Sequence, residues 1–272
     1  MKKHIFLIFT SIFIALSGIA STTVCDTNKV NVEGKKEGLW KDTINDVVYL
    51  GKYINGKKEG LWIGQFQEKN IPGVWMEEHA NDLISNIDEY KNGKRNGLCI
   101  SMDVKGYIVK KEYYTNDTLD GLSVIYYPGA KFRSKTEYKM GKLDGFSRTY
   151  YSDGRIKEEY SYKNNVRDGP SKWYFQRFSA LVTEDRVNIE YNYKNGVLEG
   201  PQKTFYRDRT LESIVNSVNN LEEGEYHSYF ENGKEKIIGK YIHGKKEGVW
   251  KEFDDSGKMI KTEIYKNGEL KK

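Results

Sequence analysis

A glycine that returns at a nearly constant interval constrains the fold of this chain more than any other feature of its sequence. We call it the anchor glycine; in most units an aromatic residue stands seven positions before it and an acidic residue directly precedes it. The series comprises Gly38, Gly60, Gly73, Gly97, Gly121, Gly145, Gly169, Gly200, Gly224 and Gly248. Six of the nine intervals are 24 residues long, so the sequence predicts an array of repeated units rather than one compact core.

Two turn signals divide each unit into two short segments. One turn lies within the motif GKYINGKKEGLW at 51–62, which returns almost unchanged as GKYIHGKKEGVW at 239–250. The second turn has glycine after a small polar residue, as in Asp153-Gly154. The segments between turns are rich in Tyr, Val, Ile, Thr and Phe, as is typical of strands. The sequence therefore predicts an all-β fold, an elongated single-layer antiparallel β-meander of about nine to ten 24-residue hairpin repeats.

Aromatic residues also recur after the anchor glycine, in two adjacent positions. Neighbouring residues of a strand point to opposite faces, so both faces of the sheet are expected to carry partly buried aromatic rings. The residue five positions after the glycine is Tyr126, Tyr150, Tyr174, Phe205, Tyr229 or Phe253. We call these six residues the ladder and predict that they bind a partner, because tyrosine offers a large contact area at low entropic cost.

Two stretches break the 24-residue period. The 13-residue step from Gly60 to Gly73 is about half a unit, which predicts a missing strand and an inversion of strand direction within 61–96. The 31-residue step from Gly169 to Gly200 predicts about seven extra residues within 176–187. Insertions in a repeat array either mark a binding surface or reflect neutral drift, and both interpretations stay open.

The first twenty residues have the layout of a secretory signal peptide. Two lysines precede an apolar run, and cleavage is expected after Ala20. An uncleaved membrane anchor is the alternative, because the run is nearly long enough to span a bilayer. The expected organisation is therefore a signal peptide at 1–20, a linker at 21–31 and the repeat array at 32–272. We expect a chain that is exported, as a periplasmic, envelope-associated or secreted protein.

The sequence has two cysteines, Cys25 and Cys99. Cys25 lies close to the expected cleavage site, but Val24 stands where a bacterial lipobox has Gly, Ala or Ser, which disfavours a lipid-anchored start. A Cys25–Cys99 disulfide is compatible with export but is not required, and two unpaired thiols are the alternative.

Residues with catalytic or metal-binding potential are present without a recognisable arrangement. The four histidines lie in separate units or in the signal peptide, and no closely spaced Cys or His pair suggests a zinc site. The acids before the anchor glycines are Glu37, Glu59, Asp120, Asp144, Asp168, Glu199, Glu223 and Glu247. A repeated solvated column gives each carboxylate the same environment, whereas acid–base catalysis needs two different ones. We therefore predict turn chemistry, and no catalytic, metal or cofactor-binding residue.

The motif Tyr-x-Asn-Gly-Lys-x-x-Gly-x-Trp at 53–62, with His in place of Asn at 241–250, resembles the MORN repeat in its bacterial variant form. The resemblance covers about residues 32–272. It implies a single-layer strip of hairpins that contacts proteins or, in some eukaryotic members, acidic lipids, and it supplies no catalytic residues. Bacterial variants are often labelled antitoxins, a role in the cytoplasm that fits poorly with an exported chain.

These observations together predict an exported, non-enzymatic repeat protein that serves as a protein-binding scaffold or adaptor. The alternatives are a membrane-surface module for acidic lipids and an antitoxin-like inhibitor of a partner toxin. The net charge of +5 falls to +3 without Lys2 and Lys3, and interspersed acids and bases predict no nucleic-acid partner. The lysines between the acids are interrupted too often to form the basic clusters that anionic membranes attract. An enzyme such as a glycan hydrolase is the least favoured class, and the oligomeric state stays open.

Overall fold

The computed structural model describes residues 27–45, 47–66, 83–176 and 184–272, which contain strands and no helix. The strands are β1 (Lys29–Val30), β2 (Lys36–Ile44), β3 (Val47–Ile54), β4 (Lys57–Phe66), β5 (Ile84–Lys91), β6 (Lys94–Met102), β7 (Ile108–Thr115), β8 (Thr118–Leu119), β9 (Gly121–Tyr126), β10 (Phe132–Lys139), β11 (Lys142–Tyr150), β12 (Ile156–Lys163), β13 (Val166–Tyr174), β14 (Val187–Lys194), β15 (Val197–Leu198), β16 (Gly200–Phe205), β17 (Leu211–Val218), β18 (Leu221–Tyr229), β19 (Glu235–Ile242), β20 (Lys245–Phe253), β21 (Met259–Lys266) and β22 (Glu269–Leu270).

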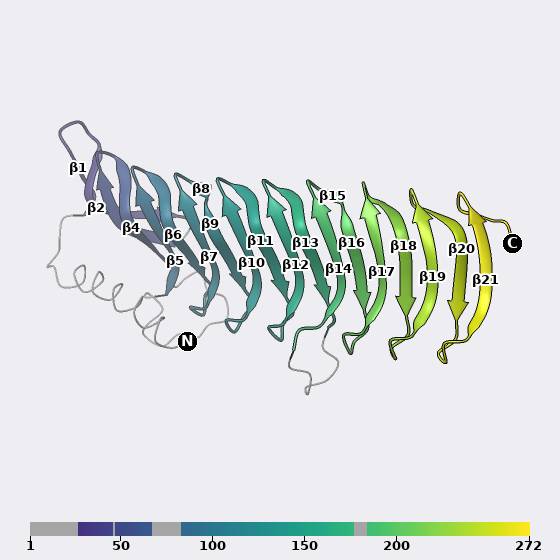
Figure 1. Cartoon of the computed structure of the whole chain (residues 1–272). Helices are drawn as coiled ribbons and strands as arrows, with labels where there is room; N and C mark the ends of the chain where they lie inside the picture. The colour runs from purple at the N-terminus through teal and green to yellow at the C-terminus, as the bar shows by residue number, and fades with distance from the viewer. Residues whose placement is uncertain (1–26, 46, 67–82, 177–183) are drawn as a thin grey trace.

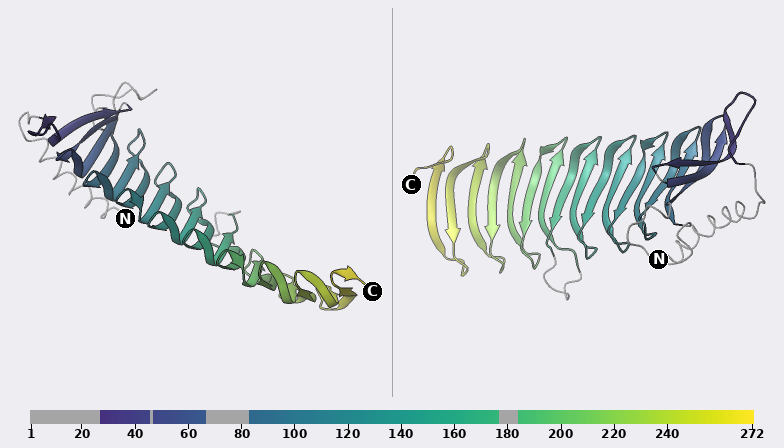
Figure 2. Two further views of the ribbon diagram at one scale, coloured as in Figure 1. Left: turned by 90° about the horizontal axis from the view of Figure 1, so that it is seen from above. Right: turned by 180° about the vertical axis from the view of Figure 1, so that it is seen from behind.

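Each strand pairs antiparallel with its neighbours along the chain, so the strands form one open sheet that advances from one end of the molecule to the other (Figure 1). β8 and β15 are short leading pieces of the strands that continue as β9 and β16. Seen from above, the sheet is a thin, twisted strip (Figure 2). The predicted all-β, single-layer meander is confirmed.

The anchor glycine occupies the same place in the sheet in every unit of the described chain. Each one lies opposite the aromatic position of the following strand, as Gly145 lies opposite Tyr162 and Gly248 opposite Tyr265. Its φ is positive in all nine described units, from 67° at Gly60 to 126° at Gly97. Residues other than glycine rarely adopt this conformation, which explains why glycine recurs there.

The strands are joined by a different type of turn at each long edge of the strip. At the upper edge of Figure 1, both turn residues have positive φ, as in Asn55 (49°) and Gly56 (76°), which defines a type I′ hairpin turn. At the lower edge, loops such as the one at Gly154 place a residue of positive φ before the next strand; the Gly154 amide donates to the Tyr151 carbonyl. The alternation of the two turn types builds the meander.

The repeated twelve-residue motif encodes one packing contact between its first and last residues. A Cβ atom added to Gly51 would lie 2.2 Å from the Trp62 ring, and one added to Gly239 would lie 2.2 Å from the Trp250 ring. Trp62 is 0% exposed, and it packs edge-on against Tyr53 with ring centroids 5.0 Å apart. The motif recurs because glycine leaves the space that the tryptophan fills.

Side chains are buried on both faces of the single layer. Trp62 and Ile63 are neighbours in β4 and therefore point to opposite faces, yet they are 0% and 5% exposed. The core is therefore two thin stripes, one on each face, rather than a thick centre. This arrangement fits the low apolar content of 38%.

The prediction of a missing strand within 61–96 is wrong. β4 pairs directly with β5, and Gly60 lies opposite Tyr90 as every other anchor glycine lies opposite its partner. The interval from Gly60 to Gly97 is therefore one full unit with 13 additional residues, since 37 exceeds 24 by 13. These fall between the paired strands, and Gly73 lies outside the described residues. Strand direction alternates without interruption.

The second irregularity is accommodated in the same way. β13 pairs with β14 along its length, with one bulge at Asn188, although their connection, which includes most of 176–187, is longer than in a regular unit. Of the two cysteines, Cys99 is a buried free thiol, while Cys25 lies outside the described residues, as does the expected signal peptide. β1 starts at Lys29, within the stretch that the sequence assigned to a linker.

Candidate binding surfaces

The acidic column holds the type I′ turns together. Seven of its eight carboxylates each accept a hydrogen bond from the backbone N–H of the first turn residue in the next hairpin. The pairs are Glu37 with Asn55, Glu59 with Asn92, Asp120 with Met140, Asp144 with Asn164, Glu199 with Asn219, Glu223 with His243 and Glu247 with Asn267, at 2.7–3.3 Å between N and O. The structure therefore gives seven of these acids a structural task, although most of them lie within strands and bond to the turn of the next hairpin rather than forming turns themselves.

The six ladder residues form a row on one face of the sheet, near its lower edge. None of them is fully exposed, and Tyr150 is only 8% exposed. The row is continuous where Phe132 fills the gap between units: its ring centroid lies 5.5 Å from that of Tyr126 and 5.8 Å from that of Tyr150. The Lys135 ammonium lies 3.5 Å from the Phe132 ring centroid. Burial raises the pKa of Tyr174 to about 12.

The aromatic position after the ladder has a structural role. The hydroxyls of Tyr127, Tyr151 and Tyr206 donate to the backbone carbonyls of the ladder residues one unit ahead. These bonds span 2.8–3.2 Å between the two oxygens and tie neighbouring lower-edge loops together. Phe175 and Phe230 occupy the same column without a hydroxyl.

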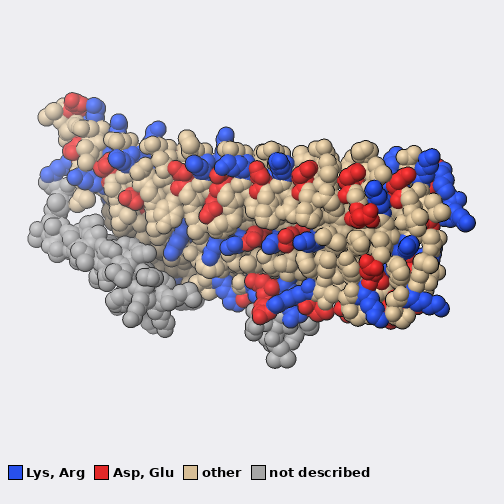
Figure 3. Space-filling model, viewed as in Figure 1, with Lys and Arg blue, Asp and Glu red and all other residues tan. Residues whose placement is uncertain are grey.

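The ladder face also carries charged side chains in opposite-sign pairs. Arg148 is paired with Glu159, and the Lys172 ammonium lies 3.5 Å from a Glu190 carboxylate oxygen. These residues share the ladder's face because they stand two positions from a ladder residue or directly across from such a position. Figure 3 shows that acidic and basic side chains are likewise interspersed over the view it presents. The surface thus carries no extended region of one sign there.

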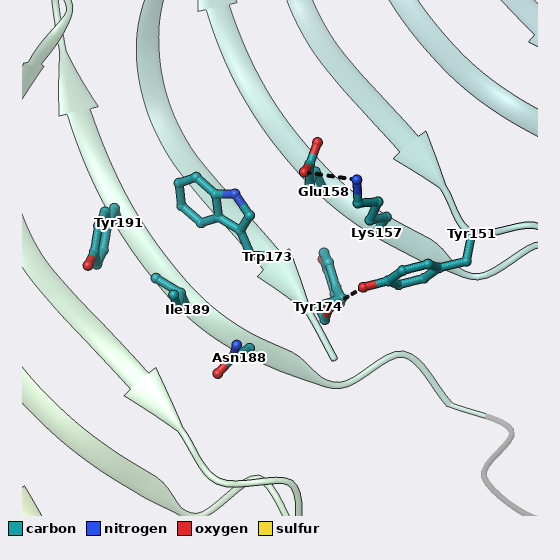
Figure 4. A pocket seen from close by; sticks show the side chains of 8 residues that line it. All are labelled: Tyr151, Lys157, Glu158, Trp173, Tyr174, Asn188, Ile189 and Tyr191. Atoms are coloured by element: carbon teal, nitrogen blue, oxygen red, sulfur yellow. Dashed lines mark hydrogen bonds and ion pairs between the residues drawn. The ribbon is translucent and has the colours of Figure 1, made fainter. Parts of the chain in front are cut away.

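An aromatic hollow on the opposite face was missed by the sequence reasoning. Its centre is Trp173 in β13, which lies directly across from Glu158 in β12 and Ile189 in β14. The hollow has a volume of about 290 Å³. Its lining consists of Tyr151, Lys157, Glu158, Trp173, Tyr174, Asn188, Ile189 and Tyr191 (Figure 4).

Tyrosine rings flank Trp173 on both neighbouring strands. The ring centroids of Tyr160 and Tyr191 lie 5.5 Å and 5.6 Å from that of Trp173, both at steep interplanar angles. In Figure 4 the indole is seen broadside while the Tyr191 ring is seen edge-on. Burial, followed by the nearby Glu158 charge, raises the pKa of Tyr160. Of these two tyrosines, Tyr191 lines the hollow and stands upright beside the indole.

Two β-bulges bring polar side chains to this hollow. The pairing of β12 with β11 skips Lys157, and the pairing of β14 with β13 skips Asn188, so both are bulged residues at equivalent positions of adjacent units. The same bulge recurs at the equivalent position of other units, for instance at Arg133 and Lys236, so it belongs to the repeat; beside Trp173 the bulged residues are polar and line the hollow. The Lys157 ammonium lies 3.5 Å from a Glu158 carboxylate oxygen.

The signal for the hollow was present in the sequence as a departure from the repeat. Trp173 stands four positions after its anchor glycine, where the other described units have Asp42, Gly64, Ser101, Ile125, Thr149, Thr204, Ser228 and Glu252. A reading based on recurring columns passes over a residue that occurs once. The repeated turns and anchor-glycine contacts do not account for a tryptophan in a column of mostly small or polar residues.

No protein-family model matches the sequence, and comparison with curated proteins found no match. The likeness to MORN repeats therefore rests on the motif residues. Within the four described ranges, no group of three or more His, Cys, Asp or Glu side chains is arranged to hold a metal ion. The described part of the chain also contains no helix with the length and apolar character needed to span a bilayer.

Proposed function

We propose that this chain is an exported, non-enzymatic scaffold that binds another protein along the ladder face. The observation that carries the proposal is the row of six aromatic side chains, one per unit, set beside ion-paired side chains on an open sheet. Aromatic residues and arginine dominate the binding energy of protein interfaces. Half-buried rings are already held in place, so they lose little further entropy when a partner covers them.

The shape of the molecule supports a role in contact. A single layer leaves both faces accessible, and a standard protein interface needs only about 800 Å² per partner. Ordinary folding does not require such an extended surface, but a scaffold uses it.

The test is affinity capture from the native envelope fraction with tagged residues 21–272. The ladder variant combines Tyr150→Leu, Tyr174→Leu and Phe205→Leu, which keeps apolar bulk and removes the rings. The matched control combines Tyr138→Leu, Tyr162→Leu and Tyr193→Leu, three aromatics from the column seven positions before the anchor glycine. Far-UV circular dichroism and thermal unfolding check that both variants fold.

We expect the wild type and the control to retain one specific protein, and the ladder variant to retain at least tenfold less of it. Equal loss from both variants, or equal retention by both, would contradict the ladder as the binding surface. Recovery of phospholipid without any enriched protein would instead support the membrane-surface alternative.

A further inference from the structure

We propose that the hollow around Trp173 is a carbohydrate-binding site that accepts one pyranose ring of an oligosaccharide. The proposal does not rest on protein binding by the ladder, because Trp173 at the centre of the hollow points to the face opposite the ladder; Tyr174 is the ladder residue that also lines the hollow. It concerns a surface centred on Trp173, whose position in the repeat holds no aromatic residue in the other described units.

The aromatic floor matches one half of the chemistry of a sugar. The axial C–H groups of a pyranose make the two faces of its ring apolar, while the hydroxyls form a polar rim. An indole face is a flat apolar surface with negative electrostatic potential, which attracts such C–H groups. Trp173 is half-buried rather than buried, and Tyr191 stands beside it as a wall.

The polar side chains match the other half. Glu158 supplies carboxylate oxygens that accept hydrogen bonds from hydroxyls, and Lys157 supplies an ammonium donor beside it. Asn188 supplies an amide that both donates and accepts, and this amide makes no hydrogen bond with another described residue. All three lie around the indole, where the rim of a ring stacked on Trp173 would be (Figure 4).

Size and polar lining favour a sugar over a larger apolar ligand. The volume of about 290 Å³ is near the lower limit of about 300 Å³ for small-molecule pockets. Besides the tyrosines, three of the eight lining residues end in polar groups: Lys157, Glu158 and Asn188. An apolar ligand would leave these polar groups unpaired.

The experiment measures binding of three probes to the purified protein: cellotetraose, chitotetraose and maltotetraose. Tryptophan fluorescence gives affinity, and saturation-transfer NMR shows which sugar protons contact the protein. We expect at least one probe to bind saturably with a Kd of about 1 mM or below. Trp173→Ala should weaken it at least tenfold, and Asn188→Ala or Glu158→Gln at least threefold. Trp40→Ala, which removes an indole on the same face of another unit, should leave it unchanged.

Because Trp173→Ala could perturb its unit, Trp173→Phe provides a second variant that keeps a ring. It should fold as the wild type does and retain more affinity than the alanine variant. No saturable binding of any probe would overturn the proposal, and so would equal affinity of the wild type and a folded Trp173→Ala variant. If no probe binds and a captured protein protects Trp173 from solvent, the hollow belongs to a protein interface.

Discussion

The contact between Gly51 and Trp62 allows the packing account to be tested with two substitutions. In Gly51→Thr, the new Cβ would lie 2.2 Å from Cδ2 and 2.4 Å from Cε2 of the indole. The ring has no space to move into, because Trp62 is 0% exposed and its N–H donates to the Lys52 carbonyl at 3.2 Å. We therefore expect a loss of about 3 kcal/mol, the upper end for overpacking a core.

The compensating substitution is available within the array itself. In another unit, Thr136 occupies the position equivalent to Gly51, and Ser147 occupies the position equivalent to Trp62. The hydroxyl oxygens of Thr136 and Ser147 lie 3.0 Å apart. Trp62→Ser alone should cost about 4 kcal/mol, because it removes a buried tryptophan. The double variant should lose about 3 kcal/mol less unfolding free energy than the two single losses added together, because each substitution relieves the defect that the other creates.

Urea unfolding followed by far-UV circular dichroism measures these differences, since a fluorescence readout would change with the lost tryptophan. The pair Gly239 and Trp250 provides an independent copy of the same cycle at the other end of the chain. Glu263→Ala, at the equivalent of the Gly51 position in the last unit, is a control that should change stability by less than about 0.5 kcal/mol. Additive losses in the double variant, or a Gly51→Thr variant as stable as the wild type, would refute the reasoning.

Four further predictions concern single residues. Glu223→Ala should cost about 1 kcal/mol and accelerate hydrogen exchange at the His243 amide, because the N–H loses its acceptor at 2.8 Å; unchanged exchange would contradict it. Met140→Asn should raise stability by about 1 kcal/mol, because Met140 has φ 50° and is 74% exposed; a lower thermal midpoint would count against this. Burial raises the pKa of Cys99 from 9.0 to about 12, so stability should fall as pH rises from about 9 towards 12, where only the unfolded state ionises. The Cys99 thiol should also react slowly with iodoacetamide at pH 8 until urea unfolds the protein, and fast labelling of the folded chain would exclude the buried position.

The repeat made most of the fold predictable from the sequence. The anchor glycines, the turn residues and the alternating strands each recur, so a single misread unit does not obscure the pattern. The error within 61–96 arose because Gly73 matched the glycine column by position while lacking the preceding acid. Only the pairing of Gly60 with Tyr90 shows that the strands meet across the insertion, and that is a long-range contact which spacing does not reveal.

The candidate sites were less predictable, for a physical reason. Recurrence identifies residues that form the turns and strand contacts of each unit, and the ladder and the acidic column were found because they recur. Seven of the eight acids bond with turns, and the ladder rings are half-buried except for that of Tyr150, which is buried. The Trp173 hollow depends on a tryptophan that occurs once in its column and on the polar residues Lys157 and Asn188 at two bulges; the bulge itself recurs in other units, but the repeat does not specify which residue occupies it.

Site-specific photocross-linking in the native envelope tests the proposed scaffold function most directly. A photoreactive residue is placed at Pro201, Glu225 or Val249, three exposed positions on the ladder face of successive units. Lys261, an exposed position on the opposite face, is the control. The account predicts that the three ladder-face positions cross-link to one and the same protein while Lys261 does not. The absence of any common protein, or equal cross-linking from both faces, would contradict it.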